Sequence, residues 1–238
     1  MGLDDIFRDA NERIASGRVS AAYHPYKDLK HTWRLSHGAL NFRVSDYLKG
    51  APPEVTDATA WYLLCRARRD QCPIGKVDTY MTYIRSKEMW APKREVFISR
   101  AKGISFRPKG TSRDLDSAFD YVNSMYFSDG LERPELAWAR ESPSRRVGFY
   151  HPPLNILAVN RALDSERVPR FVLEFVVYHE LLHGVLEPVG GPDRRVHHTA
   201  EFRRRERAFS RYEEAETWIT RISRRAKEKK TGSIVPQV

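Results

Sequence analysis

Residues 171–188 read FVLEFVVYHELLHGVLEP, an apolar run that carries His179, Glu180 and His183. Its pattern predicts a helix over about 169–186. On a helix, residues four apart lie about 40° apart around the axis and about 6 Å apart along it, so both imidazoles can reach one ion. Glu180 projects beside that ion, where a carboxylate can take a proton from a metal-bound water. The HExxH pattern therefore predicts a zinc-binding pair with an adjacent general base.

This pattern is improbable by chance and costly in its context. Random placement of this composition gives roughly 0.02 HExxH patterns per chain. Two histidines and a glutamate in a helix with buried apolar positions are unfavourable unless a partner satisfies them, and a zinc ion would do so. The alternative is a histidine pair satisfied within the core, or a surface HExxH without a metal.

A catalytic zinc needs a third protein ligand and an open fourth position. The metzincin pattern requires a glycine three residues after the second histidine and a histidine six residues after it. This chain has Leu186 and Val189 at those positions, which excludes that class. The third ligand must come from beyond the Gly-Gly-Pro turn at 190–192, which lets the chain reverse direction.

Three residues beyond that turn carry suitable side chains, namely His197, His198 and Glu201. We favour His198 because it lies four residues before Phe202, so that an apolar anchor one turn away would hold its ring toward the site. His197 can alternatively be a solvated neighbour of the site. Glu201 can alternatively be an acidic residue in the first turn of a helix, where the helix dipole favours it.

The rest of the chain predicts an α+β protein with two domains, 1–110 and 111–238. We expect helices over 4–14, 53–69, 75–90, 112–127, 169–186 and 199–225, and strands on both sides of residues 37–38 within 33–44, near 104–106, and over 136–140, 146–150 and 155–160. On the helix over 112–127 we expect one apolar side, formed by Leu115, Phe119, Val122, Met125 and Tyr126. The basic stretch from Ala91 to Arg113 contains Gly and Pro and is the best candidate for a connector between the domains.

An internal repeat is a further hypothesis. Residues 44–48 (VSDYL) align with 159–163 (VNRAL), and one gap then places Pro53 opposite Pro169 and Tyr62 opposite Tyr178. In this alignment, leucines occupy the positions that correspond to His179 and Glu180. The N-terminal half would then be a degenerate duplicate without metal chemistry. The alternative is that any strand, turn and helix with an early proline aligns this well.

Charge and composition bear on partners and compartment. The chain has 41 basic and 31 acidic residues, a net charge of +10, which permits attraction to nucleic acid. Residues 201–230 are basic but interleaved with Glu, so a solvated helix with i,i+4 ion pairs is favoured over a phosphate-contacting one. No apolar run approaches the roughly 18 residues of a membrane span. Two cysteines and the absence of a signal-like N-terminus predict a cytoplasmic protein.

The order of these features resembles the SprT-like family of zinc metallopeptidases, which have the zincin fold. The resemblance is carried by the following stretches, which cover somewhat under half of the chain: FDYVNSMYFSDGLERPELAW, RRVGFY, NILAVNRALDSERVP, YHELLHG and HHTAEF. The first 110 residues have no recognised counterpart in that family. Two cysteines also cannot build the cysteine zinc ribbon that SprT proteins commonly carry.

The resemblance implies a three-stranded sheet packed on the HExxH helix, with zinc held by His179, His183 and His198. Glu180 would act as general base and then as general acid in hydrolysing peptide bonds with a zinc-activated water. A substrate backbone would lie along the exposed strand edge at 146–150. Tyr150 and Tyr178 are weaker candidates for an oxyanion donor, because a tyrosine in an apolar element usually belongs to the core.

Three classes of function follow from the sequence. The favoured class is a zinc-dependent metallopeptidase with a protein or peptide substrate. The second is a DNA-associated protein of the SprT-like type that acts on DNA-bound proteins. The third is a zinc-stabilised, non-enzymatic binding protein whose metal is closed by a fourth protein ligand such as Glu201 or His197.

Overall fold

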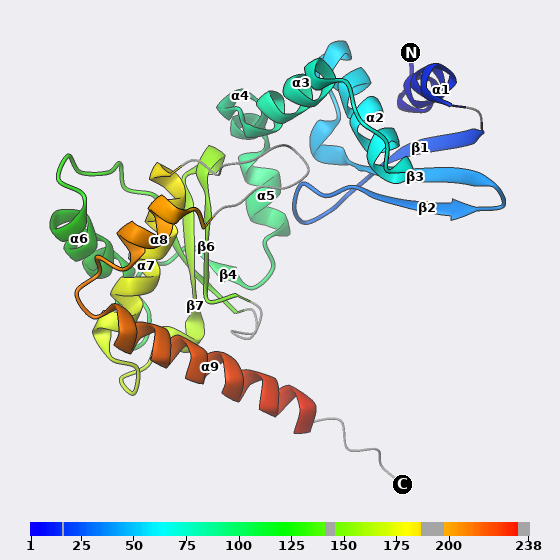
Figure 1. Ribbon diagram of the computed structural model, residues 1–238. Helices are drawn as coiled ribbons and strands as arrows, with labels where there is room; N and C mark the ends of the chain where they lie inside the picture. Colours follow the sequence, from blue (N-terminus) through cyan, green and yellow to red (C-terminus); the bar gives the residue numbers. More distant parts are fainter. Residues whose placement is uncertain (16, 141–145, 187–197, 233–238) are drawn as a thin grey trace, which may run out of the picture. The chain divides into compact units, whose positions relative to one another are not determined.

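The computed structural model describes residues 1–15, 17–140, 146–186 and 198–232. The chain is α+β, as expected, and divides into two compact units. Unit 1 is Met1–Ala101 and unit 2 is Lys102–Val238 (Figure 1). The division therefore lies before the boundary expected at residue 110, but within the predicted connector.

The first half of that predicted connector is helical, so the expectation was wrong there. A 3-10 turn, η2 (Ala91–Lys93), leads into helix α5 (Arg94–Arg100). Pro92 lies in the first turn of η2, where its missing N–H costs nothing, so the chain can continue into α5. Phe97 is buried and anchors α5 to the core of unit 1.

Unit 1 contains a three-stranded sheet with the order β1-β3-β2. Its strands are β1 (Arg18–His24), β2 (Thr32–Ser36) and β3 (Ala39–Ser45), and the central β3 is parallel to β1 and antiparallel to β2. The expected hairpin is confirmed, since His37 and Gly38 both have the positive φ of a two-residue primed turn. The sequence analysis missed β1.

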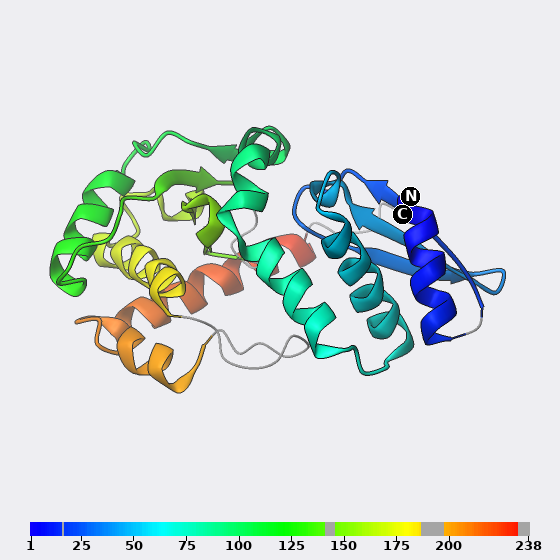
Figure 2. The same cartoon turned by 90° about the horizontal axis from the view of Figure 1, so that it is seen from above.

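Apart from α5, the helices of unit 1 are those predicted from the sequence, with one correction. Helix α1 (Leu3–Ile14) packs on β1 and beside α2 (Pro53–Arg68), and α2 lies beside α3 (Ile74–Arg85) (Figure 2). The single helix expected over 75–90 is interrupted at Ser86. This residue has extended backbone, and its hydroxyl caps the short α4 (Lys87–Trp90).

Unit 2 contains a four-stranded sheet with the order β4-β5-β7-β6. Its strands are β4 (Ile104–Ser105), β5 (Glu135–Ala139), β6 (Gly148–His151) and β7 (Ile156–Asn160). The central β7 is parallel to β5 and antiparallel to β6, which makes β6 an edge strand. All four strands were expected, and β4 adds one to the three that the family resemblance implies.

Helix α7 (Arg170–Val185) is the centre of unit 2 and coincides with the predicted HExxH helix. It packs on β6 and β7, and its other sides contact helices α6, α8 and α9. Because it is enclosed, most of its residues from Phe171 to Leu182 are buried. Even Glu174 is buried, and Arg170 satisfies it through an ion pair of 2.7 Å.

Helix α6 (Leu115–Tyr126) covers α7 with the predicted apolar side, except for one residue. Leu115, Phe119 and Val122 are buried, whereas Met125 is 61% exposed and does not belong to that side. The reason is helical geometry, since at about 100° per residue Met125 lies about 60° around the axis from Val122 and about 100° from Tyr126, at the margin of the apolar side.

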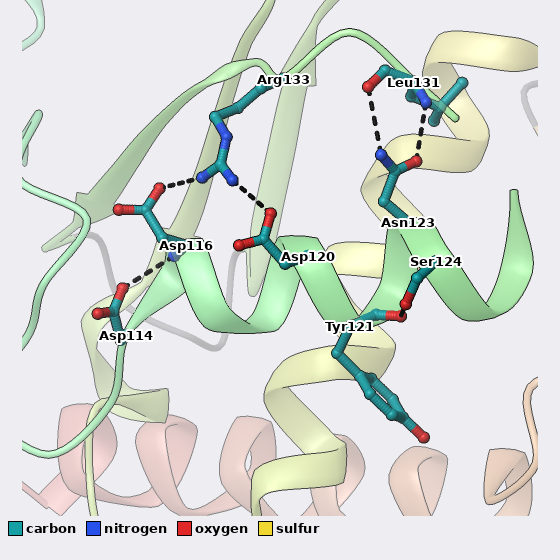
Figure 3. Close-up of polar contacts among 8 residues, drawn as sticks. All are labelled: Asp114, Asp116, Asp120, Tyr121, Asn123, Ser124, Leu131 and Arg133. Atoms are coloured by element: carbon teal, nitrogen blue, oxygen red, sulfur yellow. Dashed lines mark hydrogen bonds and ion pairs between the residues drawn. The ribbon is translucent and has the colours of Figure 1, made fainter. Parts of the chain in front are cut away.

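Polar side chains fix the two ends of α6 (Figure 3). Asp114 caps the first turn by accepting from the N–H of Asp116 at 2.9 Å. Asn123 accepts from the N–H of Leu131 at 2.8 Å and donates to its carbonyl at 3.3 Å, which fastens the chain leading to β5. Arg133 bridges two aspartates of α6. Asn123, which belongs to the first stretch of the family resemblance, thus has a role in local structure.

The last predicted helix, over 199–225, is in fact two helices. They are α8 (Ala200–Glu206) and α9 (Tyr212–Gly232). The break inserts Phe209 into the core, where it is 3% exposed and stacks on Tyr126 and Tyr178 at centroid distances of 5.2 and 5.7 Å. Burial of that ring outweighs the continuation of the helix.

The two units share an order of α-helices and longer strands. In unit 1 the order is α1, β1, β2, β3, a 3-10 turn η1 (Asp46–Leu48) and α2. In unit 2 it is α6, β5, β6, β7, η4 (Arg161–Leu163) and α7, with two additions, the short β4 before α6 and a 3-10 turn η3 (Pro152–Leu154) between β6 and β7. In each sheet the third of these strands is parallel to the first and antiparallel to the second. A tandem duplication predicts this shared order, and the duplication itself stays a prediction.

The helix caps shift the predicted repeat alignment by one residue. Pro52 caps α2 and Pro169 caps α7, whereas the sequence alignment paired Pro53 with Pro169. Counted from these caps, Tyr62 and Arg66 stand where α7 has His179 and His183. Arg66 donates to the Tyr62 hydroxyl at 3.0 Å.

Among the described residues, no helix combines the length and the apolar character that crossing a membrane requires.

The structure predicts that Asp164 stabilises unit 2. Its carboxylate is 2% exposed and accepts from the backbone N–H groups of Thr111, Ser112 and Arg113 at 2.7–3.0 Å. Asp164→Ala should lower the free energy of unfolding by about 3 kcal/mol, because three backbone N–H donors, two of them in partly buried hydrogen bonds, lose their acceptor. Urea denaturation measures this, with Asp120→Ala, an exposed ion-pair residue, as a control that should change by less than about 1 kcal/mol.

The same carboxylate predicts a pH dependence. Burial alone would raise the pKa of Asp164, but the three backbone N–H groups outweigh it and lower the pKa below the ordinary 3.8. Its contribution to stability is therefore complete above about pH 4 and is lost as the pH falls through the lower folded pKa. Equal destabilisation by Asp164→Ala at pH 7 and at pH 2 would contradict this.

Candidate metal centre

Three histidines gather at one point of unit 2. His179 and His183 come from successive turns of α7, and His198 from the residue before the N-cap of α8. One nitrogen from each ring lies within 4.8 Å of the others, and the Nε2 atoms of His183 and His198 are 3.3 Å apart. The three ring centroids are separated by 5.0–5.1 Å. The structure thus brings together the three predicted ligands.

The start of α8 explains the placement of His198. The Thr199 hydroxyl caps the helix by accepting from the N–H of Phe202 at 3.1 Å. Phe202 is fully buried, and its ring centroid lies 5.2 Å from that of His179 and 4.7 Å from those of His183 and His198. The predicted apolar anchor therefore contacts all three imidazoles.

The other two candidates for the third ligand have different outcomes. Glu201 belongs to α8, but its carboxylate binds Arg204 and Arg205 at 2.8 Å. These hydrogen bonds lower the pKa of Glu201 to about 2. Glu201 is not part of the histidine group, as its alternative interpretation predicted. His197 lies outside the described residues.

Glu180 is buried beside this group. Its side chain sits in α7 with a residue exposure of 7%, and burial raises its pKa from 4.5 to about 7. The positive charges of His179 and Arg146 and a hydrogen bond from the Tyr150 backbone oppose that rise. A carboxyl group with a pKa near neutrality can both take and return a proton at physiological pH.

Two glycines allow β6 to approach α7 closely, and the sequence analysis did not select either. A Cβ on Gly148 would lie 2.8 Å from Oε1 of Glu180. A Cβ on Gly184 would lie 2.6 Å from the ring of Tyr150. Both distances are too short for real atoms, so glycine at these positions is what lets the edge strand lie against the face of α7 that carries Val176, Glu180 and Gly184. Gly184 directly follows the second histidine of HExxH, and a glycine at that place in a helix could have indicated a close contact with another element.

The two tyrosines considered as oxyanion donors have their hydroxyls engaged elsewhere. Tyr178 is 3% exposed and donates to the carbonyl of Arg205 at 2.6 Å. Tyr150 donates to Oδ1 of Asn155 at 2.8 Å. Their roles are therefore structural, which was the alternative for both.

A further carboxylate, Glu206 of α8, was missed from the sequence. Its Oε1 lies 2.6 Å from Nδ1 of His179. Burial alone would lower the pKa of His179, but the hydrogen bond with Glu206 and the negative charges of Glu180, Glu206 and Glu216 together outweigh it and raise the pKa. The spacing between Glu206 and HExxH gave no signal, because it depends on how α8 packs.

The basic C-terminal segment carries the ion pairs that a solvated helix predicts. Arg211 binds Glu214, and Arg224 lies 3.6 Å from Glu228. Nucleic acid as a partner of this segment stays a prediction, and a steep fall of DNA affinity with salt would support it.

Comparison of the chain with models of protein families, with curated proteins and with solved structures found no significant match. The functional argument therefore depends on the site itself.

The close approach at Gly148 predicts a sensitive position. Gly148→Ala should lower the free energy of unfolding by about 1–3 kcal/mol, because the new Cβ displaces Glu180 and Val176. Urea denaturation measures the change. The matched control is Gly75→Ala, where nothing lies within 4 Å of the new atom, so that stability should stay the same or rise by up to about 1 kcal/mol. Equal effects of the two substitutions would contradict the packing described here.

Proposed function

We propose that the chain is a zinc-dependent metallopeptidase of the zincin type, related to the SprT-like family. One observation carries this proposal: nitrogens of His179, His183 and His198 converge next to the buried carboxylate of Glu180. The packing of the HExxH helix on a small sheet with β6 at its edge supports the zincin assignment.

The donor set fits zinc. Three neutral imidazole nitrogens suit this ion, and three protein ligands are the number found in catalytic zinc sites, which keep a fourth position for water or substrate. Glu201 is held by two arginines, so its carboxylate does not compete for that position. When bound, zinc lowers the pKa of a coordinated water and polarises a carbonyl group.

The residues of the chain then divide the remaining work. Glu180 accepts a proton from the attacking water and returns it to the amine of the leaving peptide. Its burial supports this role, because a pKa near 7 leaves both protonation states accessible. Tyr150 positions Glu180 through its backbone N–H.

The edge strand β6 supplies a place for an extended substrate. In the described sheet β6 pairs with β7 on one side, and its other edge pairs with no described strand. A peptide backbone that adds to this edge would lie beside Glu180, because Gly148 of β6 meets that carboxylate. Main-chain hydrogen bonds would give affinity with little sequence preference.

A zinc-stabilised, non-enzymatic protein is the competing function. It requires a fourth protein ligand that closes the site. Glu201 was one candidate for this fourth ligand, but its carboxylate is engaged by Arg204 and Arg205. A closed structural site would also not require a buried glutamate, such as Glu180, beside the histidines. Hydrolysis measured on the zinc-loaded protein separates the two functions.

Glu180→Gln tests the assignment directly. The substitution should leave zinc content unchanged and lower kcat on an unfolded protein substrate by about 100-fold to 10,000-fold, because general acid–base catalysis is lost. The matched control is Glu174→Gln, which alters another buried glutamate of α7 at its ion pair with Arg170 and should retain activity per folded molecule. Activity retained in Glu180→Gln would overturn the mechanism.

His198→Ala tests the third ligand. Zinc affinity, measured by competition with a chelator, should fall by more than about 100-fold, since a directly binding group contributes more than an outer partner. His197→Ala is the matched control and should change affinity by less than about threefold. The reverse result would assign the third ligand to His197.

A further inference from the structure

We propose that Glu206 is a positioning residue of the metal centre that fixes the orientation and tautomer of His179. The inference rests on the proposed function, because it assigns to a fourth side chain a task in holding the same ion. Its foundation is the contact of 2.6 Å between Oε1 of Glu206 and Nδ1 of His179.

The contact is sheltered and comes from two different helices. The side chain of Glu206 is 12% exposed and that of His179 is 23% exposed. His179 lies in α7, whereas Glu206 is the last residue of α8. A hydrogen bond that joins partly buried groups is screened less by water than a surface pair, so it can hold a ring in place.

A neighbouring hydrogen bond holds Glu206 in register. Tyr178, the residue before His179, donates to the carbonyl of Arg205, the residue before Glu206, at 2.6 Å. Two consecutive residues of α7 therefore bind two consecutive residues of α8. Because Tyr178 fixes the backbone at this point, Glu206 has little freedom to leave the imidazole.

The chemistry of imidazole gives this contact its consequence. A neutral histidine carries one ring proton, and a carboxylate can only accept, so the proton must reside on Nδ1 of His179. The lone pair is then on Nε2, the only other ring nitrogen, which makes it the metal-binding atom. The carboxylate also makes the ring more basic and so a stronger ligand.

Charge alone does not explain the arrangement. Glu180, Glu206 and Glu216 all act electrostatically on His179, but among these three carboxylates only Glu206 forms a hydrogen bond with its ring. Glu216 therefore offers a control that removes a similar charge and leaves the hydrogen bond in place. A structural role for Glu206 alone would not alter the ring tautomer.

The experiment compares zinc binding by the full chain and by three variants, Glu206→Ala, Glu206→Gln and Glu216→Gln. Zinc affinity is measured by chelator competition, and the tautomer of His179 in the metal-free protein by ¹⁵N NMR. We expect Glu206→Ala to weaken zinc binding about 10-fold to 100-fold and to lose the Nδ1–H signature. Glu206→Gln should fall between Glu206→Ala and the natural chain, because its amide oxygen still accepts. Glu216→Gln should change affinity by less than about threefold.

The possible results separate this inference from the proposed function. If the natural chain binds zinc and all three variants bind it equally, the positioning role is overturned and the metallopeptidase proposal stands. An equal loss of zinc affinity in Glu216→Gln and Glu206→Gln would show that negative charge near His179 matters and the hydrogen bond does not, which would also overturn the positioning role. If the natural chain does not bind zinc, the proposed function fails, and this inference fails with it. Thermal unfolding of the metal-free variants shows whether each is folded.

Discussion

The burial of polar groups in an apolar helix is the constraint on which unit 2 depends. Helix α7 is enclosed by a sheet and three helices, yet it carries Glu180, His179 and His183 on consecutive turns. Polar groups in such a position are costly unless each has a partner. The surrounding structure supplies these partners from different elements: β6 meets Glu180, α8 meets His179, and His198 approaches His183. The position of β6 and the presence of α8 both follow from that requirement.

The part of this arrangement that the sequence predicts is the part with local periodicity. HExxH places two imidazoles on one face of any helix, and Phe202 marks His198 through a spacing of one turn. Glu206 has no such signal, because its contact with His179 depends on how α8 packs against α7, and α8 ends in a break that the sequence did not indicate. That break exists since Phe209 enters the core beside Tyr178, a tertiary effect that overrides helix propensity. For the same reason one helix was predicted where the structure has two.

Unit 1 shows how the same order of elements can exist without the chemistry. Counted from the capping prolines, Tyr62 and Arg66 stand at the positions of His179 and His183, and they bind each other. Tyr62 also stacks on Tyr80 at 4.6 Å, and Tyr80 forms a hydrogen bond of 2.9 Å with the partly buried His31. In unit 1, aromatic and hydrogen-bonded contacts satisfy the side chains at these positions, whereas in unit 2 a metal ion would satisfy their counterparts. The sequence suggested a degenerate half through its leucines, but the pairing of these side chains required the structure.

In the proposed metal centre, Glu180 and Glu206 illustrate why two carboxylates need different surroundings. A group that transfers protons must remain able to change its charge, which burial against the backbone of β6 provides. A group that orients a ligand must keep its hydrogen bond throughout the reaction, which the adjacent bond from Tyr178 to the α8 backbone provides. The first carboxylate comes from the helix that carries His179 and His183, and the second comes from the helix that follows His198. Packing of α8 against α7 therefore places both the proposed third ligand and the proposed orienting partner, so that loss of this packing would remove both together.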